Sequence, residues 1–338
     1  MYDFCLEPTN ICNRNCRHCI RNKVDPPQSI PLNVVQHIFA QAQALGMKRL
    51  CLTGGELAAY PHLEELLRMA ADHGFLFKLV TNGFRFKDRL LPLLSEPKVS
   101  EVFTGVCFSL DGSRAETHDA LRGQGSFKEV IEAATICKLK GWKIGLKSAI
   151  TNFNKDELTD LALLGATLGA EDHGFLLLYP TPQLIQENII PSLEERLYFS
   201  QWIMTSLART IRSKIHVEGA HEGGAVFNCA NINQLINIDF QGNLILCCNL
   251  SHVIEGDGIP TRLGAEFLAD LKEVSLREGI IRHYQGVADL MAARLNDAEK
   301  LAGLTYIPCY WCFKHFGKLD WLKGFPDSPW AAGVLANA

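Results

Sequence analysis

The run Cys12-Asn-Arg-Asn-Cys16-Arg-His-Cys19 is the most informative stretch of this chain. Its spacing is C-x3-C-x2-C, and it follows the apolar segment 2–6, which predicts a short strand. A cubane iron–sulfur cluster normally takes four ligands, so three thiolates in one loop leave one iron without a nearby protein ligand. Because an open iron can bind a substrate or cofactor, the spacing predicts chemistry at the cluster rather than simple electron storage.

Zinc is the main alternative for these cysteines. Structural zinc usually takes four ligands in C-x2-C pairs, and no second pair lies near the triad. Arg17, Arg21 and Lys23 add positive charge that would stabilise thiolates in the loop. The sequence therefore favours iron and sulfur, with zinc or purely structural cysteines as the competing interpretations.

Four later segments follow the triad in order. They are Thr53-Gly54-Gly55-Glu56, Val80-Thr81-Asn82-Gly83, Phe108-Ser109-Leu110-Asp111-Gly112 and His118-Asp119-Ala120-Leu121-Arg122-Gly123. Together with the triad, from about residue 3 to 180, they resemble the radical S-adenosylmethionine (SAM) superfamily. A single Gly-Gly-Glu run would be a weak signal, whereas ordered matches along half a chain are specific.

The resemblance implies a site with named residues. Its four-iron, four-sulfur (4Fe–4S) cluster would be held by Cys12, Cys16 and Cys19 and would bind SAM through the open iron. The residues implied to contact SAM are His18, Gly54, Gly55, Glu56, Asn82, Ser109 and Arg122, with His18 where the family usually has an aromatic residue near the adenine. Arg122 suits the SAM carboxylate. One electron, from a flavodoxin- or ferredoxin-type donor, would cleave SAM to a 5′-deoxyadenosyl radical that abstracts hydrogen from an unactivated C–H bond.

The composition excludes several classes of protein. The chain has 338 residues, 47% of them hydrophobic, and a net charge of −4 without a long basic run, so nucleic-acid binding has no electrostatic support. No apolar stretch reaches the ~18–20 residues that cross a bilayer, and no signal peptide precedes the first strand. Twelve cysteines without a secretion signal predict a reducing cytoplasm and cluster ligation.

Alternating strand and helix patterns predict an α/β fold. Strands are expected at 2–6, 48–52, 75–80, 101–110, 142–150 and 175–179, with helices between them. Six such units predict parallel strands in a partial (β/α)6 barrel, similar to a TIM barrel, with the site at the carboxyl ends of the strands. Capping boxes at Ser126/Glu129, Asn154/Glu157 and Ser192/Glu195 are expected to begin three of the helices. We place the barrel in residues 1–213 and a second domain in 214–338.

The second domain carries its own cysteine group. Cys229, Cys247, Cys309 and Cys312 supply four thiolates, and residues 237–246 read as a hairpin that returns Cys247 toward Cys229. This region resembles the short "twitch" form of the SPASM domain, which implies an auxiliary 4Fe–4S cluster. A zinc ribbon is the alternative, since four cysteines also suit zinc.

Two features of this region have open interpretations. Cys248 is either an inert thiol beside a ligand or a hydrogen-atom donor to a substrate radical, as in some radical SAM epimerases. About sixty residues separate Cys248 from Cys309, with a helical pattern at 286–304. They either pack against the barrel or shape a substrate pocket.

The sequence leaves three functions open. The first is oxidation or epimerisation of a small molecule in natural-product biosynthesis, and the second is maturation of a ribosomally made peptide. Peptide-modifying relatives often have an N-terminal leader-recognition domain, and only eleven residues precede Cys12, which favours the small molecule. The third is a non-catalytic electron carrier or scaffold, which the open-iron loop argues against.

Overall fold

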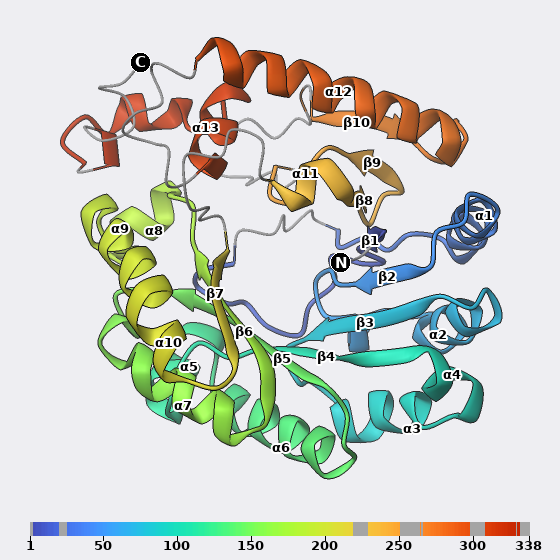
Figure 1. Ribbon diagram of the computed structural model, residues 1–338, viewed down its shortest axis with the longest axis horizontal. Coiled ribbons are helices and arrows are strands. Elements are labelled where there is room, and N and C mark those ends of the chain that lie inside the picture. The colour runs from blue at the N-terminus through green and yellow to red at the C-terminus, as the bar shows by residue number, and fades with distance from the viewer. Residues whose placement is uncertain are drawn as a thin grey trace.

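A ten-stranded sheet organises the computed structural model, which describes residues 3–19, 26–218, 229–250, 264, 266–297, 308–328 and 330–331 (Figure 1). Its strand order is β10-β9-β8-β1-β2-β3-β4-β5-β6-β7. The strands are β1 Phe4–Leu6, β2 Arg49–Leu52, β3 Leu76–Thr81, β4 Phe103–Ser109, β5 Ile144–Ile150, β6 Ala170–Leu177, β7 Lys214–Glu218, β8 Ile236–Ile238, β9 Asn243–Ile245 and β10 Phe267–Asp270.

Helices cover the outer side of the curved sheet (Figure 1). The α-helices of the described residues are α1 Leu32–Ala44, α2 Leu63–Asp72, α3 Leu91–Leu94, α4 Pro97–Val102, α5 Ala115–Arg122, α6 Ser126–Leu139, α7 Leu158–Thr167, α8 Pro182–Gln186, α9 Leu193–Trp202, α10 Ala208–Thr210, α11 Ala230–Gln234, α12 Leu276–Asn296 and α13 Pro308–His315. Strands β1 to β6 pair in parallel in chain order, which confirms the partial barrel of six units.

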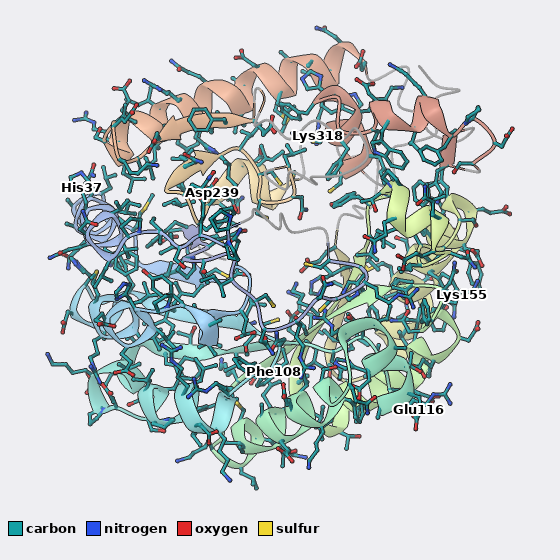
Figure 2. All side chains as sticks on the ribbon, turned by 180° about the vertical axis from the view of Figure 1, so that it is seen from behind. His37, Phe108, Glu116, Lys155, Asp239 and Lys318 are labelled. Carbon is teal, nitrogen blue, oxygen red and sulfur yellow. The ribbon has the colours of Figure 1, made fainter. Side chains whose placement is uncertain are left out.

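The core lies between the sheet and these helices. Phe4, Phe77 and Phe108 are fully buried on the outward face of their strands, and each contributes about 2 kcal/mol by leaving water. Figure 2 shows Phe108 inside the molecule and Glu116 of α5 at its rim. The alternation of buried and less buried residues along β3 directs every second side chain to the opposite, inner face.

The sheet extends beyond the six predicted strands at both edges. β7 pairs in parallel with β6, and β8 pairs in parallel with β1. The predicted hairpin at 237–246 is confirmed as β8 and β9, with Gly242 at a φ of 83° in its turn. A further strand, β10, lies against β9, and α12 runs along β10. Strands from both sides of the predicted boundary at residue 213 thus belong to one sheet. The division of the chain into two domains at that residue stays a prediction.

The capping predictions have different outcomes. Ser192 and Glu195 form the expected capping box at the start of α9. The box at Ser126/Glu129 is wrong, because the Asp119 carboxylate accepts the N–H groups of Gly125 (2.7 Å) and Phe127 (2.8 Å) instead.

The box at Asn154/Glu157 is also wrong. A short 3-10 turn, Lys155–Glu157, precedes α7. The Asn154 amide donates to the backbone oxygens of Asp111 and Ala149, both at 2.7 Å. Glu157 instead accepts the Ser113 hydroxyl at 3.0 Å. Both side chains therefore serve tertiary contacts rather than the helix end.

The predicted helical pattern at 286–304 falls partly in α12, which ends at Asn296, while 298–304 lie outside the described residues. Among the described helices, none combines the length and the apolar character that a membrane span requires.

Candidate functional site

The segments singled out in the sequence meet at one edge of the sheet. The cysteine loop follows β1, Gly54 to Glu56 follow β2, Asn82 follows β3 and Asp111 follows β4. Because these strands are parallel, their carboxyl ends lie side by side. The fold therefore brings together residues that are up to about a hundred positions apart in the chain.

Gly54 and Gly55 allow a close approach between two backbone segments. A Cβ atom at Gly55 would lie 2.2 Å from the Ile11 oxygen, and one at Gly54 would lie 2.6 Å from the Thr9 oxygen. The N–H groups of Gly55 and Glu56 donate to those same oxygens, each at 2.8 Å. The glycines thus dock the start of the cysteine loop onto the end of β2, a packing role that the sequence did not reveal.

Glu56 links the ends of β2 and β3. Its buried carboxylate accepts hydrogen bonds from the Ala58 N–H (3.0 Å), the Thr81 hydroxyl (2.7 Å) and the Asn82 N–H (2.8 Å). Burial raises the pKa of Glu56, although these hydrogen bonds oppose the rise. The hydrogen bond to the Asn82 N–H makes Glu56 a structural support for Asn82.

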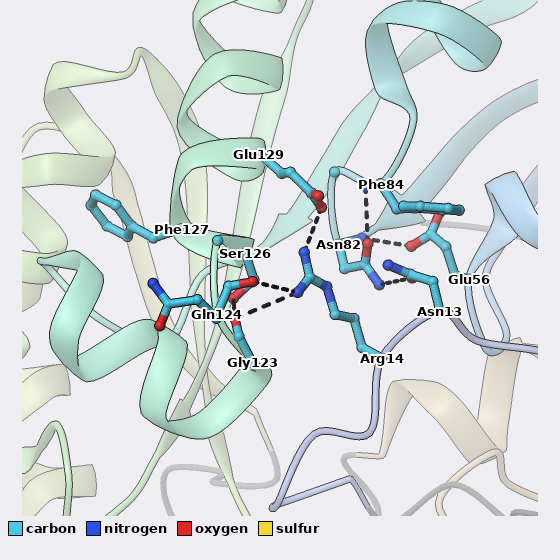
Figure 3. Close-up of polar contacts among 12 residues, drawn as sticks. Asn13, Arg14, Glu56, Asn82, Phe84, Gly123, Gln124, Ser126, Phe127 and Glu129 are labelled. Atoms are coloured by element: carbon cyan, nitrogen blue, oxygen red, sulfur yellow. Dashed lines mark hydrogen bonds and ion pairs between the residues drawn. The ribbon is translucent and has the colours of Figure 1, made fainter.

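Asn82 in turn holds the cysteine loop. Its side-chain amide donates to Asn13 Oδ1 at 2.9 Å and lies 3.8 Å from Cys12 Sγ, while its own oxygen accepts the Phe84 N–H. Figure 3 shows the sequence of contacts from Glu56 through Asn82 to Asn13. Of the residues predicted to contact SAM, Asn82 is thus one that holds the loop through its side chain.

Two arginines fix the loop to the other side of the barrel. Arg14 donates to Glu129 Oε2 at 2.7 Å and to the Gln124 oxygen at 3.1 Å, which ties the loop to α6 and the turn before it (Figure 3). Arg17 binds the Glu187 carboxylate at 3.0 Å and lies over the Phe153 ring. The loop is therefore held at several points across the carboxyl edge.

The positive charge beside Cys16 comes from residues other than those first expected. Arg17 is occupied by Glu187, and Arg21 and Lys23 lie outside the described residues. Burial raises the pKa of the Cys16 thiol, and Arg122, followed more weakly by Arg14, opposes the rise. The larger part of the charge that favours the thiolate thus comes from Arg122, far from the loop in the sequence.

The donor chemistry of the triad fits an iron–sulfur cluster. Burial, helped by the charges of Glu56, Cys16 and Cys19, raises the pKa of Cys12 to about 11, so the three sulfurs lie near one another. Cys12 and Cys19 are exposed and Cys16 is half-buried. Within the described ranges, no three potential ligands already surround one ion position. The triad is therefore a set of accessible neighbouring thiols in a loop that is anchored at both ends.

A buried charged cluster lies beside the triad. The Asp111 carboxylate binds Arg122 Nε, lies 3.2 Å from His18 Nε2 and accepts the Ala149 N–H at 2.7 Å. Burial alone would raise the pKa of Asp111, but Arg122 and the nearby histidines outweigh it and lower the pKa to about 2. Burial lowers the pKa of both His18 and His118 to about 4, so both rings are neutral at pH 7.

This cluster leaves part of Arg122 available. Its Nε is bound by Asp111, but its two terminal nitrogens make no hydrogen bond or ion pair with any residue that the structure describes. They fit the carboxylate role predicted for Arg122. Ser109, two residues before Asp111, ends β4 on the inner face and is half-buried. Sequence reasoning missed Asp111 as a site residue, although its place at a strand end was a usable signal.

The second cysteine group also comes together. Cys247 follows β9, Cys229 precedes α11, and α13 carries Cys309 and Cys312 on one side at a spacing of three. The pKa of Cys247 is raised by its hydrogen bond with Cys248, by burial and by the charges of Cys229 and Cys309. Arg294 donates to Cys312 Sγ at 2.6 Å. Four thiols with a cation beside them suit either a cluster or zinc.

Cys248 lies between this group and the barrel. It contacts Cys247, and its charge also acts on Cys5 of β1, which faces the inner side of the sheet. The position leaves both interpretations of Cys248 open.

The sequence was compared with protein-family models and with characterised proteins, and one family model matches. The model described as the radical SAM superfamily matches residues 6–164. The chain is 28% identical to the AdoMet-dependent heme synthase of Methanosarcina barkeri over 52% of this chain and 50% of that protein. It is 26% identical to the mycofactocin maturase MftC of Mycolicibacterium smegmatis over 71% of this chain and 62% of that protein. The chain thus spans about half to three fifths of these relatives.

A solved structure has the same fold. Streptococcus suis SuiB bound to the precursor peptide SuiA superposes with a TM-score of 0.58 at 15% identity, over 82% of this chain and 66% of that one.

Proposed function

Because this chain belongs to the radical SAM superfamily through residues 6–164, we propose that it uses a 5′-deoxyadenosyl radical to modify a peptide. The enzyme class rests on the family match. The observation that carries the site is the cysteine loop clamped beside Arg122, whose terminal nitrogens are available for a carboxylate. A 4Fe–4S cluster on the three thiols would supply the electron that cleaves SAM.

The protein's own residues would position SAM. Arg122 would bind the SAM carboxylate through its terminal nitrogens, and Asp111 would hold that guanidinium in place. Asn82, supported by Glu56, would keep the loop in position beside the ligand. His18, neutral and packed against Asp111, would face the adenine without adding charge.

The peptide takes precedence over the small molecule favoured in the sequence analysis. A maturase matches across 71% of the chain, well beyond the radical SAM domain itself. The SuiB fold neighbour is one whose structure contains a bound precursor peptide. The heme synthase match, which covers only 52% of the chain, keeps a small-molecule substrate as the second candidate.

Anaerobic turnover tests this function. Protein reconstituted with iron and sulfide is expected to form 5′-deoxyadenosine from SAM and dithionite. Candidate precursor peptides, sugars and nucleosides are then added in heavy water, and the products are weighed by mass spectrometry. We expect a modified peptide, either short of two hydrogens after oxidation or carrying one solvent deuterium after epimerisation. Products from small molecules alone would contradict the peptide, and no 5′-deoxyadenosine would contradict the enzyme class.

Cys248 has a defined place in that experiment. If it donates a hydrogen atom, a Cys248→Ala variant makes 5′-deoxyadenosine but no deuterium-labelled product. An oxidised product that does not depend on Cys248 would leave it as an inert thiol next to Cys247.

We further propose that Cys229, Cys247, Cys309 and Cys312 hold a second 4Fe–4S cluster. A Cys309→Ser/Cys312→Ser variant is expected to lose about half of its iron, roughly four of eight atoms, while it still cleaves SAM. Iron and sulfide analysis measures this. Cys137→Ala is the matched control, since Cys137 lies on α6 away from both groups, and its iron content should not change. Unchanged iron in the double variant would overturn the second cluster. Zinc bound in the purified protein would instead assign these four cysteines to a zinc site.

A further inference from the structure

The inner face of the sheet carries charged side chains. Lys78 lies between Phe77 and Leu79, whose side chains are fully buried on the opposite, outward face of β3. Lys147 of β5 and His216 of β7 alternate with buried residues in the same way. All three are half-buried. The inside of this barrel is therefore polar at mid-height. In many β/α barrels, branched apolar side chains fill this space instead.

Lys147 and His216 have acidic partners on the same face, Glu218 and Asp172. Lys147 forms an ion pair with Glu218. His216 lies 3.3 Å from Asp172 through Nδ1 and 3.6 Å from Glu218 through Nε2. These residues come from β5, β6 and β7, and the two carboxylates balance the cations around them.

Lys78 is the exception. It makes no hydrogen bond or ion pair with any residue in the described part of the chain. Its charge acts on Lys147 of β5 and Asp172 of β6 without direct contact.

Glycines make room for the two ammonium groups. Gly105 is the register partner of Lys78, and Gly174 is the register partner of Lys147. A Cβ at Gly145 would lie 2.9 Å from Lys78 Nζ, and a Cβ at Gly174 would lie 2.9 Å from Lys147 Nζ. Any larger residue would push these side chains aside. The glycine at position 145 leaves room for Lys78, whose ammonium reaches across β4 to β5.

We propose that Lys78 binds a carboxylate of the substrate inside the barrel. A single unpaired ammonium matches a singly charged anion, because the inner face of the sheet also carries Asp172 on β6 and Glu218 on β7, and these carboxylates would repel a phosphate dianion more strongly. The inference rests on the proposed function and specifies its substrate as one with an acidic group, either an Asp or Glu side chain of a peptide or a free small acid.

The position of Lys78 suits an anchor rather than a reacting group. Asn82, which contacts the cysteine loop, lies four residues further along β3, a rise of about 13 Å. An acidic side chain held by Lys78 would therefore leave the rest of an extended substrate directed at the carboxyl edge. Lys78 is in this sense a specificity residue.

Binding of matched probes tests the proposal. The first pair is N-acetyl-L-glutamate and N-acetyl-L-glutamine, and the second is a short peptide with one central glutamate and its glutamine twin. Each is titrated into the reconstituted enzyme with SAM and followed by ligand-observed NMR. We expect the acidic member of one pair to bind. Lys78→Met should raise its dissociation constant about tenfold or more, which is the usual contribution of a hydrogen bond to a charged group. Binding of only the free acid identifies a small molecule, and binding of only the peptide identifies a peptide.

Lys143→Met is the matched control. Lys143 precedes β5 and is exposed, with 72% of its side chain accessible, and it lies 4.0 Å from Glu171. Its loss should leave probe binding unchanged, and Lys78→Arg should retain the preference for the acid. If the wild type binds neither acid, does not distinguish acid from amide, or keeps its preference in Lys78→Met, the proposal is wrong. If Lys78→Met does not fold, Lys78→Gln takes its place.

Two further measurements separate this inference from the proposed function. Substrate-free formation of 5′-deoxyadenosine and the iron content should both be the same in Lys78→Met and the wild type. If the wild type itself fails to cleave SAM, the proposed function fails, yet the probe titrations still decide the role of Lys78. If Lys78 only supported the fold, its loss would lower the thermal midpoint without changing the ratio of acid to amide binding.

Discussion

The variant with alanine at Cys12, Cys16 and Cys19 is expected to form no detectable 5′-deoxyadenosine and to keep about half of its iron, roughly four of eight atoms. These thiols are the accessible sulfurs of the loop, and they lie near Arg14 and Arg122. Without them, SAM would have no iron to bind beside Arg122. The measurement is anaerobic turnover with dithionite, with 5′-deoxyadenosine determined by chromatography and iron by a colorimetric assay.

The Cys309→Ser/Cys312→Ser variant serves as the reciprocal control, because it should lose a similar amount of iron and still cleave SAM. Circular dichroism of both variants checks that the barrel remains folded. Cleavage of SAM by the triple alanine variant would refute the assignment of the open-iron site to this loop.

The second large effect is expected at Asp111. Asp111→Ala should lower the free energy of unfolding by about 3–5 kcal/mol, because it leaves the Arg122 guanidinium without its partner in a buried place. The same change removes the acceptor for the Ala149 N–H and the contact with His18. Denaturant unfolding followed by circular dichroism measures the loss, and SAM binding should weaken because Arg122 is no longer held in position.

Two comparisons make this test specific. Asp72 also has a cationic partner, Lys98 at 3.2 Å, but both side chains are exposed, so Asp72→Ala should have little effect on stability. The double variant Asp111→Leu/Arg122→Met removes both buried charges and should be more stable than Asp111→Ala alone. An Asp111→Ala protein as stable as the wild type would show that the cluster does not depend on this carboxylate.

Local sequence patterns predicted much of the fold. The strands β1 to β6 follow from apolar runs separated by helical periods, and parallel pairing follows from the helices between them. The prediction was least accurate for the sixth strand, which was expected from Phe175 and begins at Ala170. The polar run Glu171 to His173 hid the start of β6: Glu171 is exposed, Asp172 pairs with His216, and the buried His173 ring lies 2.7 Å from the Ser148 hydroxyl.

Helix starts were predictable only where the cap was local. The capping box of Ser192 with Glu195 needs only the helix itself, and it formed. Ser126 and Asn154 have the same spacing, but partners outside the helix were within reach, the Asp119 carboxylate for Ser126 and the Asp111 oxygen for Asn154. A polar side chain hydrogen-bonds to the partner that packing brings closest. The spacing of residues in the sequence does not show which partner that is.

The sequence by itself determined the cysteine triad, the order of the strands and the edge at which the motifs meet. These depend on spacing and periodicity, which are local properties of a chain. Only the tertiary structure decided the partners: Arg14 on Glu129, Asp111 on Arg122, β8 beside β1, and Lys78 left without a partner among the described residues. The physical reason is that an ion pair, or the lack of one, is set by distances in space, and these follow from how helices and strands pack together.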